Sequence, residues 1–76
     1  MAADEIRSLL EEAFPGGTIN VVDRTGGGDH FHVTVVAPAF DGLPLVQQHR
    51  LVNHALARPL ADGSIHELRI TTKGTA

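Results

Sequence analysis

The sequence contains no cysteine, tryptophan or tyrosine. Of these absences, that of cysteine excludes the most classes of function. Without cysteine, no disulfide can staple the fold and no thiol can act as a nucleophile. Small secreted domains usually need such staples, so the composition favours a protein of the cytoplasm. Any metal that this chain holds by itself must therefore bind histidine, aspartate or glutamate.

Long hydrophobic runs are also absent. No apolar stretch approaches the ~20 residues that span a bilayer, so we expect no membrane partner. The first twelve residues carry four acidic side chains and one arginine, which is the wrong charge for a signal or transit peptide. We therefore expect a mature soluble protein that forms a single domain over residues 1–76, because so short a chain cannot supply a second core.

Positive charge is scarce, since six Lys and Arg stand against nine Asp and Glu for a net charge of -3. A basic face normally supplies most of the affinity for nucleic acid, because it releases counterions from the phosphates. This balance argues against autonomous nucleic-acid binding and leaves room only for a local patch. The cations available for such a patch are Arg50, Arg58, Arg69 and Lys73.

Hydrophobic periodicity and turn residues divide the chain into helices and strands. The expected elements are a helix over residues 2–14, strands over 18–24 and 30–37, a turn over 38–44, a helix over about 45–57, a short helical turn over 58–62 and a strand over 65–72. The residues after Lys73 are expected to fray, as chain ends commonly do.

This order predicts an α+β domain. Two strands joined by a tight glycine-rich loop pair antiparallel, whereas a strand that arrives through a helical crossover can lie parallel to one of them. We therefore expect a three-stranded mixed sheet with both long helices on one face. Leu45, Val52 and Leu56 fall on one line of the second long helix, which is expected to face the sheet.

Five histidines are the unusual feature of the composition. His49 lies beside the apolar line of its helix and is expected to pack there, whereas His54 points to solvent. His30 stands where the glycine-rich loop enters its strand, and His66 begins the last strand. The two imidazoles approach if these strands start level with each other, and imidazole is a common ligand of Fe, Zn and Cu. A histidine at a strand end is more often structural, and the sequence leaves the register open.

Other familiar sites are missing. The loop over residues 25–29 lacks the G-x-x-x-x-G-K pattern of phosphate-binding loops and does not lead directly into a helix. No serine lies in a nucleophile elbow. The sequence therefore predicts a protein that is not an enzyme.

Several segments together resemble the BolA family. They are the turn Phe40-Asp41-Gly42, the helical segment from Val46 to Val52, the strand from Ile65 to Ile70, and Asp29-His30-Phe31 at the start of the second strand. The resemblance covers nearly all of the chain. It implies an αββ(α)αβ domain with the class II KH-like topology of the BolA fold, in agreement with the order expected from periodicity.

The resemblance also implies a function. BolA-like proteins pair with monothiol glutaredoxins and share a 2Fe-2S cluster with them, or form an apo interface, in iron-sulfur trafficking and iron regulation. By this resemblance the chain is a monomer without a cofactor when alone, and a heterodimer with its glutaredoxin partner. The glutaredoxin and its glutathione supply two thiolates to the cluster, and this chain supplies imidazoles, as at the His₂ iron of Rieske centres.

The resemblance points to particular ligands. His66 matches the C-terminal ligand histidine of the family. The family's second ligand is a His or Cys of the loop between the first two strands, but residues 25–29 contain neither, which leaves His30 at the loop edge. The alternative function implied by the family is a DNA-binding transcriptional regulator, for which the four cations named above are the candidates. The G-x-x-G loop of KH domains is absent here.

Overall fold

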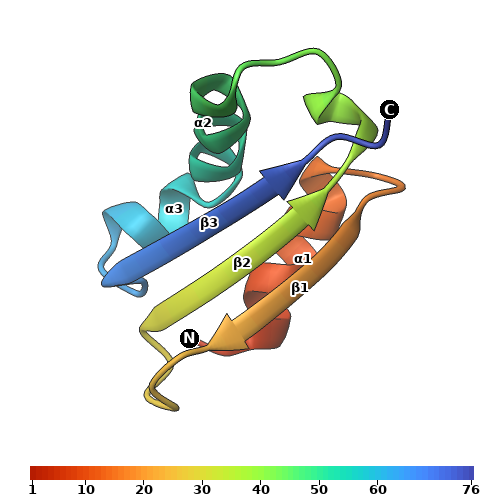
Figure 1. Cartoon of the computed structure of the whole chain (residues 1–76). Helices are drawn as coiled ribbons and strands as arrows, with labels where there is room; N and C mark the ends of the chain where they lie inside the picture. Colours follow the sequence, from red (N-terminus) through yellow and green to blue (C-terminus); the bar gives the residue numbers. More distant parts are fainter.

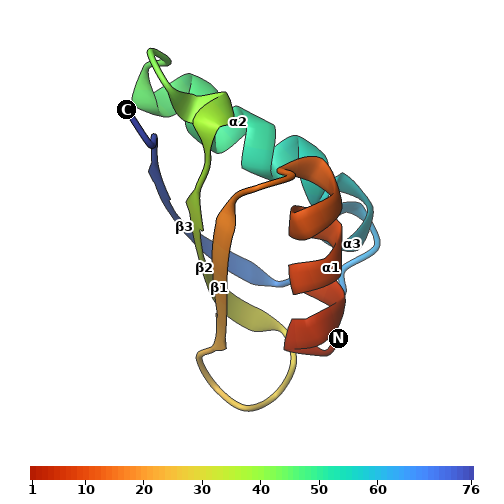
Figure 2. The ribbon, with the colours of Figure 1, turned by 90° about the vertical axis from the view of Figure 1, so that its right-hand side faces the viewer.

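The hydrophobic pattern of the chain builds a layer of helices against one face of a three-stranded sheet. The computed structural model describes all of residues 1–76. In chain order the elements are α1 (Ala3–Ala13), β1 (Thr18–Asp23), β2 (His30–Val36), the short 3-10 helix η1 (Pro38–Phe40), α2 (Leu45–Ala55), α3 (Ala57–Ala61) and β3 (Glu67–Lys73) (Figure 1). Figure 2 views the sheet from its side and shows the helices together on one side of it. The α+β fold expected from the sequence is confirmed.

The sheet has the strand order β1-β2-β3. The hairpin strands β1 and β2 pair antiparallel, and β3 pairs parallel to β2 with His30 opposite Glu67. A parallel pair starts at the same edge of the sheet. The beginning of β3 therefore lies beside the end of the glycine-rich loop, which is the register that the sequence left open.

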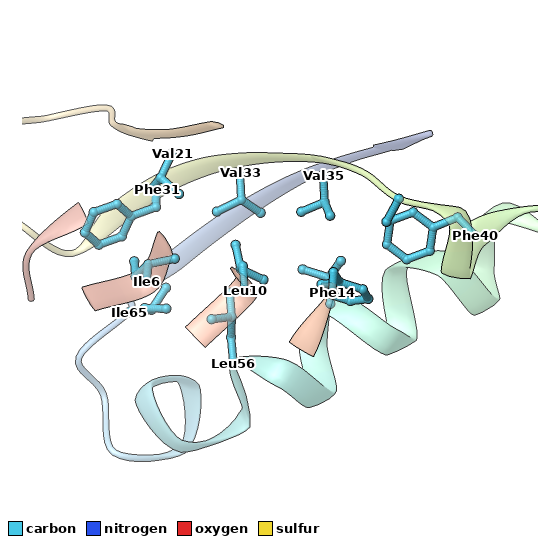
Figure 3. Packing of buried hydrophobic residues seen from close by; sticks show 12 residues of the cluster. Ile6, Leu10, Phe14, Val21, Phe31, Val33, Val35, Phe40, Leu56 and Ile65 are labelled. Atoms are coloured by element: carbon cyan, nitrogen blue, oxygen red, sulfur yellow. The ribbon is translucent and has the colours of Figure 1, made fainter. Parts of the chain in front are cut away.

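The core lies between β2 and the helices. Phe31, Val33 and Val35 alternate along β2 and are completely buried, because successive side chains of a strand point to opposite faces. Ile6 and Leu10 of α1 meet them from the helical layer (Figure 3). This alternation turns His30 and His32 away from the core.

Phe14 and Phe40 belong to the same buried cluster as these residues. Their ring centroids lie 5.1 Å apart with an interplanar angle of 52°, within the range in which aromatic pairs add about 0.5–1.5 kcal/mol beyond burial. The contact joins the end of α1 to η1, and so fixes the turn that leads into α2.

The second long helix differs from its prediction in two ways. The expected helix over 45–57 is divided at Leu56 into α2 and α3, and α3 is the extra helical turn expected near 58–62. Leu45 was predicted to face the sheet with Val52 and Leu56, but its side chain is 60% exposed. Complete burial within α2 is reached only at Val52, because the first turn of the helix lies beyond the core. No helix combines the length and the apolar character needed to cross a membrane.

The C-terminal residues do not fray as expected. The backbone N–H groups of Thr75 and Ala76 donate hydrogen bonds to Oδ1 of Asp41, at 2.6 and 3.2 Å, and the Thr75 hydroxyl donates to Oδ2 at 3.1 Å. A Cβ at Gly74 would collide with the Asp41 carboxylate, so glycine permits this close approach. The expectation of a frayed end was wrong because the hydrogen-bond acceptor, Asp41, lies far away in the sequence.

We expect the substitution Asp41→Ala to release the C-terminal residues. Loss of the carboxylate removes the acceptor of both backbone N–H groups, so hydrogen exchange at Thr75 and Ala76, measured by NMR, should become as fast as in an unstructured peptide. Asp62→Ala is the matched control, because Asp62 accepts its hydrogen bond from Ser64 and does not touch the tail. Unchanged exchange in Asp41→Ala would contradict the prediction.

The attachment should also depend on pH. The hydrogen bonds from the Thr75 backbone, then from the Ala76 backbone and the Thr75 hydroxyl, lower the pKa of Asp41 below its ordinary value of 3.8. A lowered pKa in the folded chain means that the attachment is fully present above the ordinary value and is lost as the pH falls through the lowered one. Amide shifts of Thr75 recorded during acid titration should therefore move below pH 3.8.

Candidate metal centre

Asp29, His30 and His66 meet at one end of the sheet. One possible ligand atom from each residue lies within 4.8 Å of the others. His66 Nδ1 is 3.2 Å from Asp29 Oδ2, and His30 Nδ1 is 3.9 Å from Asp29 Oδ1. The two imidazole rings have centroids 6.3 Å apart in an edge-to-face arrangement. The two histidines that the sequence singled out are therefore neighbours, and a carboxylate lies between them.

Backbone hydrogen bonds explain why these residues meet. The carbonyl oxygen of Asp29 accepts from the N–H of His66 at 2.8 Å and from the N–H of Glu67 at 3.2 Å. The Arg24 N–H donates to the carbonyl oxygen of His30 at 2.8 Å. His66 was expected to begin the last strand, but it lies one residue before β3. All three strands are thus tied together beside the site.

The glycine-rich loop is held from within. The Asp23 carboxylate accepts from the N–H groups of Gly26 and Gly28, both at 3.0 Å. The terminal ammonium of Met1 donates to the carbonyl oxygen of Gly28 at 2.8 Å. Both glycines have a positive φ, which L side chains rarely adopt. These contacts hold the backbone that leads directly into Asp29.

The site is open to solvent. The His66 side chain is 64% exposed, whereas His30 and Asp29 are about one-third exposed. Beside them, Arg24 Nη1 lies 2.6 Å from Glu67 Oε1 and forms an ion pair. The Glu67 carboxylate is therefore engaged by a guanidinium, while Asp29 has only imidazoles as potential cationic partners.

The remaining histidines lie elsewhere. His32 Nε2 is hydrogen-bonded to the Thr71 hydroxyl at 2.9 Å on the sheet face away from the helices. His49 is half-buried and His54 is exposed, as expected from their helical positions.

The sequence did not identify Asp29 as a site residue. Its signal is a carboxylate directly before a candidate histidine, which gains meaning only once the parallel register brings His66 beside it.

The four candidate cations for nucleic acid do not form one patch. Arg69 and Lys73 alternate with the side chains of β3 that pack on the helices, so they lie on the open face of the sheet. Arg50 and Arg58 are exposed on α2 and α3, which lie on the other side. Arg58 also lines a pocket with three carboxylates, those of Glu5, Glu12 and Asp62, which disfavour an anion.

Comparison with known proteins places the chain among relatives of one kind. The model of a family described as BolA-like protein matches residues 8–76. The protein RP812 of Rickettsia prowazekii is 33% identical over 72 residues, covering 95% of this chain and 92% of that protein. The DNA-binding transcriptional regulator BolA of Vibrio cholerae is 39% identical over an alignment of 82 positions, which covers 99% of this chain and 76% of that protein. The chain spans only 56% of mouse BolA-like protein 1, to which it is 37% identical over 93% of its own length.

Solved structures agree with this. BolA1 from Arabidopsis thaliana superposes with a TM-score of 0.86 at 31% identity, covering 96% of this chain and 90% of that one. The BolA domain of SufE1 from the same plant gives 0.86 at 32% identity, with coverage of 96% and 91%. The mixed sheet and its helical layer are therefore shared with these structures.

The glycine loop offers a test of how Asp29 is held. We expect Gly28→Ala to destabilise the chain more than Gly26→Ala. Both glycines have φ near +77°, so both alanines cost about 1–2 kcal/mol for the left-handed conformation. A Cβ at Gly28 would also lie 2.8 Å from the Met1 carbonyl oxygen, whereas a Cβ at Gly26 meets no atom within 4 Å.

The extra loss should be about 1 kcal/mol, the net value of the hydrogen bond between Met1 and Gly28. Urea unfolding measures the difference, and amide shifts of Asp29 and His66 should change only in Gly28→Ala. Equal losses of unfolding free energy in the two variants would show that the Met1 contact does not hold the loop.

Proposed function

Because this chain belongs to the BolA-like protein family, we propose that it is a non-enzymatic partner of a monothiol glutaredoxin in iron-sulfur trafficking or iron regulation. In this proposal the two proteins hold a 2Fe-2S cluster between them, and His66 and His30 are the ligands from this chain. The observation that carries the proposal is the meeting of the exposed imidazole of His66 and the partly exposed imidazole of His30 at one end of the sheet.

The residues present fit such a shared cluster. Imidazole is a neutral ligand that suits iron, and the His₂ iron of Rieske centres has the same donor set. Ligand atoms of His30 and His66 within 4.8 Å of each other need only small side-chain rotations to reach one iron. The chain has no thiol, so the remaining ligands have to come from glutaredoxin and glutathione.

Each residue has a distinct task in this arrangement. His66 is the more exposed ring and presents its donor to the partner, while His30 is held by its strand. A bound cluster would store an electron, or would itself be transferred to a recipient protein. The proposal includes a cytoplasmic location, where the thiols of the partner stay reduced.

Co-expression with a monothiol glutaredoxin tests the proposal. We expect a complex whose visible absorption differs from that of the glutaredoxin homodimer, because imidazole replaces thiolate on one iron. His66→Ala should remove most of that difference, and His30→Ala should reduce it. His54→Ala is the matched control, since this exposed histidine lies on α2 away from the site. Identical spectra for the wild type and His66→Ala would exclude His66 as a ligand.

DNA binding is the second candidate, favoured by the name of the Vibrio cholerae relative. Arg69 and Lys73 on the open face of the sheet are the cations that could contact phosphates together. Two contacts predict that the logarithm of affinity falls with that of salt concentration with a slope of about -2.

This second candidate is tested by duplex binding in a salt series. We expect Arg69→Ala to weaken binding at every sequence tested, and Arg58→Ala, on the other side of the molecule, to bind like the wild type. Absence of binding at low salt would remove the candidate.

A further inference from the structure

Asp29 has no role in the proposed cluster ligation, yet its carboxylate lies between the two imidazoles. Its oxygens are 3.2 Å from His66 Nδ1 and 3.9 Å from His30 Nδ1. The third donor of the group is therefore a carboxylate of this same chain. Two imidazoles and one carboxylate are a donor set that borderline divalent metal ions prefer.

The separations are close to those in a metal site. Ligands about 2.1 Å from a tetrahedral Zn²⁺ lie ~3.4 Å from one another. The contact of His66 Nδ1 with Asp29 Oδ2, at 3.2 Å, is close to this separation. The contact of His30 Nδ1 is with the other oxygen, Oδ1, at 3.9 Å, so the side chains have to rotate before one oxygen and both imidazoles reach a single ion. All ligand atoms lie within 4.8 Å, and rotation of partly exposed side chains can close the rest without moving the backbone.

Apart from their contacts with one another, the three donor side chains form no hydrogen bond or ion pair. Among the side-chain hydrogen bonds of the chain, only His32 uses an imidazole. The nearby carboxylate of Glu67 is occupied by Arg24, so it neither competes for the ion nor leaves the guanidinium to neutralise Asp29. No Lys or Arg side chain lies within ion-pair distance of the Asp29 carboxylate, so a cation between the three residues would balance its negative charge.

We propose that Asp29, His30 and His66 bind a single divalent transition-metal ion, Zn²⁺ foremost, on this chain alone. Three protein ligands leave a fourth position of the tetrahedron for water or for a donor from another molecule. The proposal does not rest on the glutaredoxin partnership, because it needs no second protein. It shares two ligands with the proposed cluster, so a bound Zn²⁺ and the cluster exclude each other.

The metal-free chain tests this proposal. Titration with ZnCl₂, followed by isothermal calorimetry, should give one ion per chain, and Co²⁺ should give visible d-d absorption at the same stoichiometry. Asp29→Asn keeps the side-chain shape and removes the charge. It should weaken Zn²⁺ binding at least tenfold, which is about the smallest loss caused by removing even a supporting residue of a metal site. His66→Ala should weaken it by at least as much.

Controls distinguish the site from non-specific binding. His54→Ala should bind Zn²⁺ like the wild type, and ring signals of His30 and His66, but not those of His32, should shift in NMR spectra. Circular dichroism checks that each variant is folded. If His66→Ala is unfolded, the Zn²⁺ affinity of Asp29→Asn alone tests the proposal. Wild-type affinity in Asp29→Asn, or no binding by the wild-type chain, would overturn the inference. A failure here leaves the spectra of the glutaredoxin complex unaffected, so the two proposals fail separately.

Discussion

The hydrogen bond from the His66 N–H to the carbonyl oxygen of Asp29 sets the register of β3 on β2, and the site depends on that register. A slip by one residue would reverse the faces of β3, because its side chains alternate. Leu68 and Ile70, which pack against the core, would then point away from the helices. Burial of these two side chains therefore protects the position of His66.

One strand serves both the core and the site. Phe31 is completely buried, and the preceding residue, His30, emerges at the end of the sheet. The net free energy of unfolding expected for 76 residues is roughly 4–11 kcal/mol. A deep cavity would remove core packing on which this small stability depends. A site built from side chains at the end of the sheet leaves the core intact.

Periodicity was enough to predict the helices and strands, because the apolar residues of α1 and β2 repeat with the periods of those elements. The positions of His30 and His66 in the predicted strands also identified them as candidate ligands. Periodicity could not assign Asp29, because the meaning of that carboxylate comes from a pairing between residues far apart in the chain. The exposure of Leu45 was missed for a related reason: a helical pattern does not tell where the neighbouring sheet ends.

The contact between Asp41 and the C-terminal residues also joins distant segments, separated by 34 positions between Asp41 and Thr75. It brings both ends of the segment that contains α2, α3 and β3 together. A chain ordered as a closed loop has already lost the entropy of joining its ends, and this loss grows only slowly with loop length. The carboxylate at the start of this segment therefore anchors the chain just beyond β3, so that the strand can peel from the sheet at this end only after the hydrogen bonds to Asp41 break.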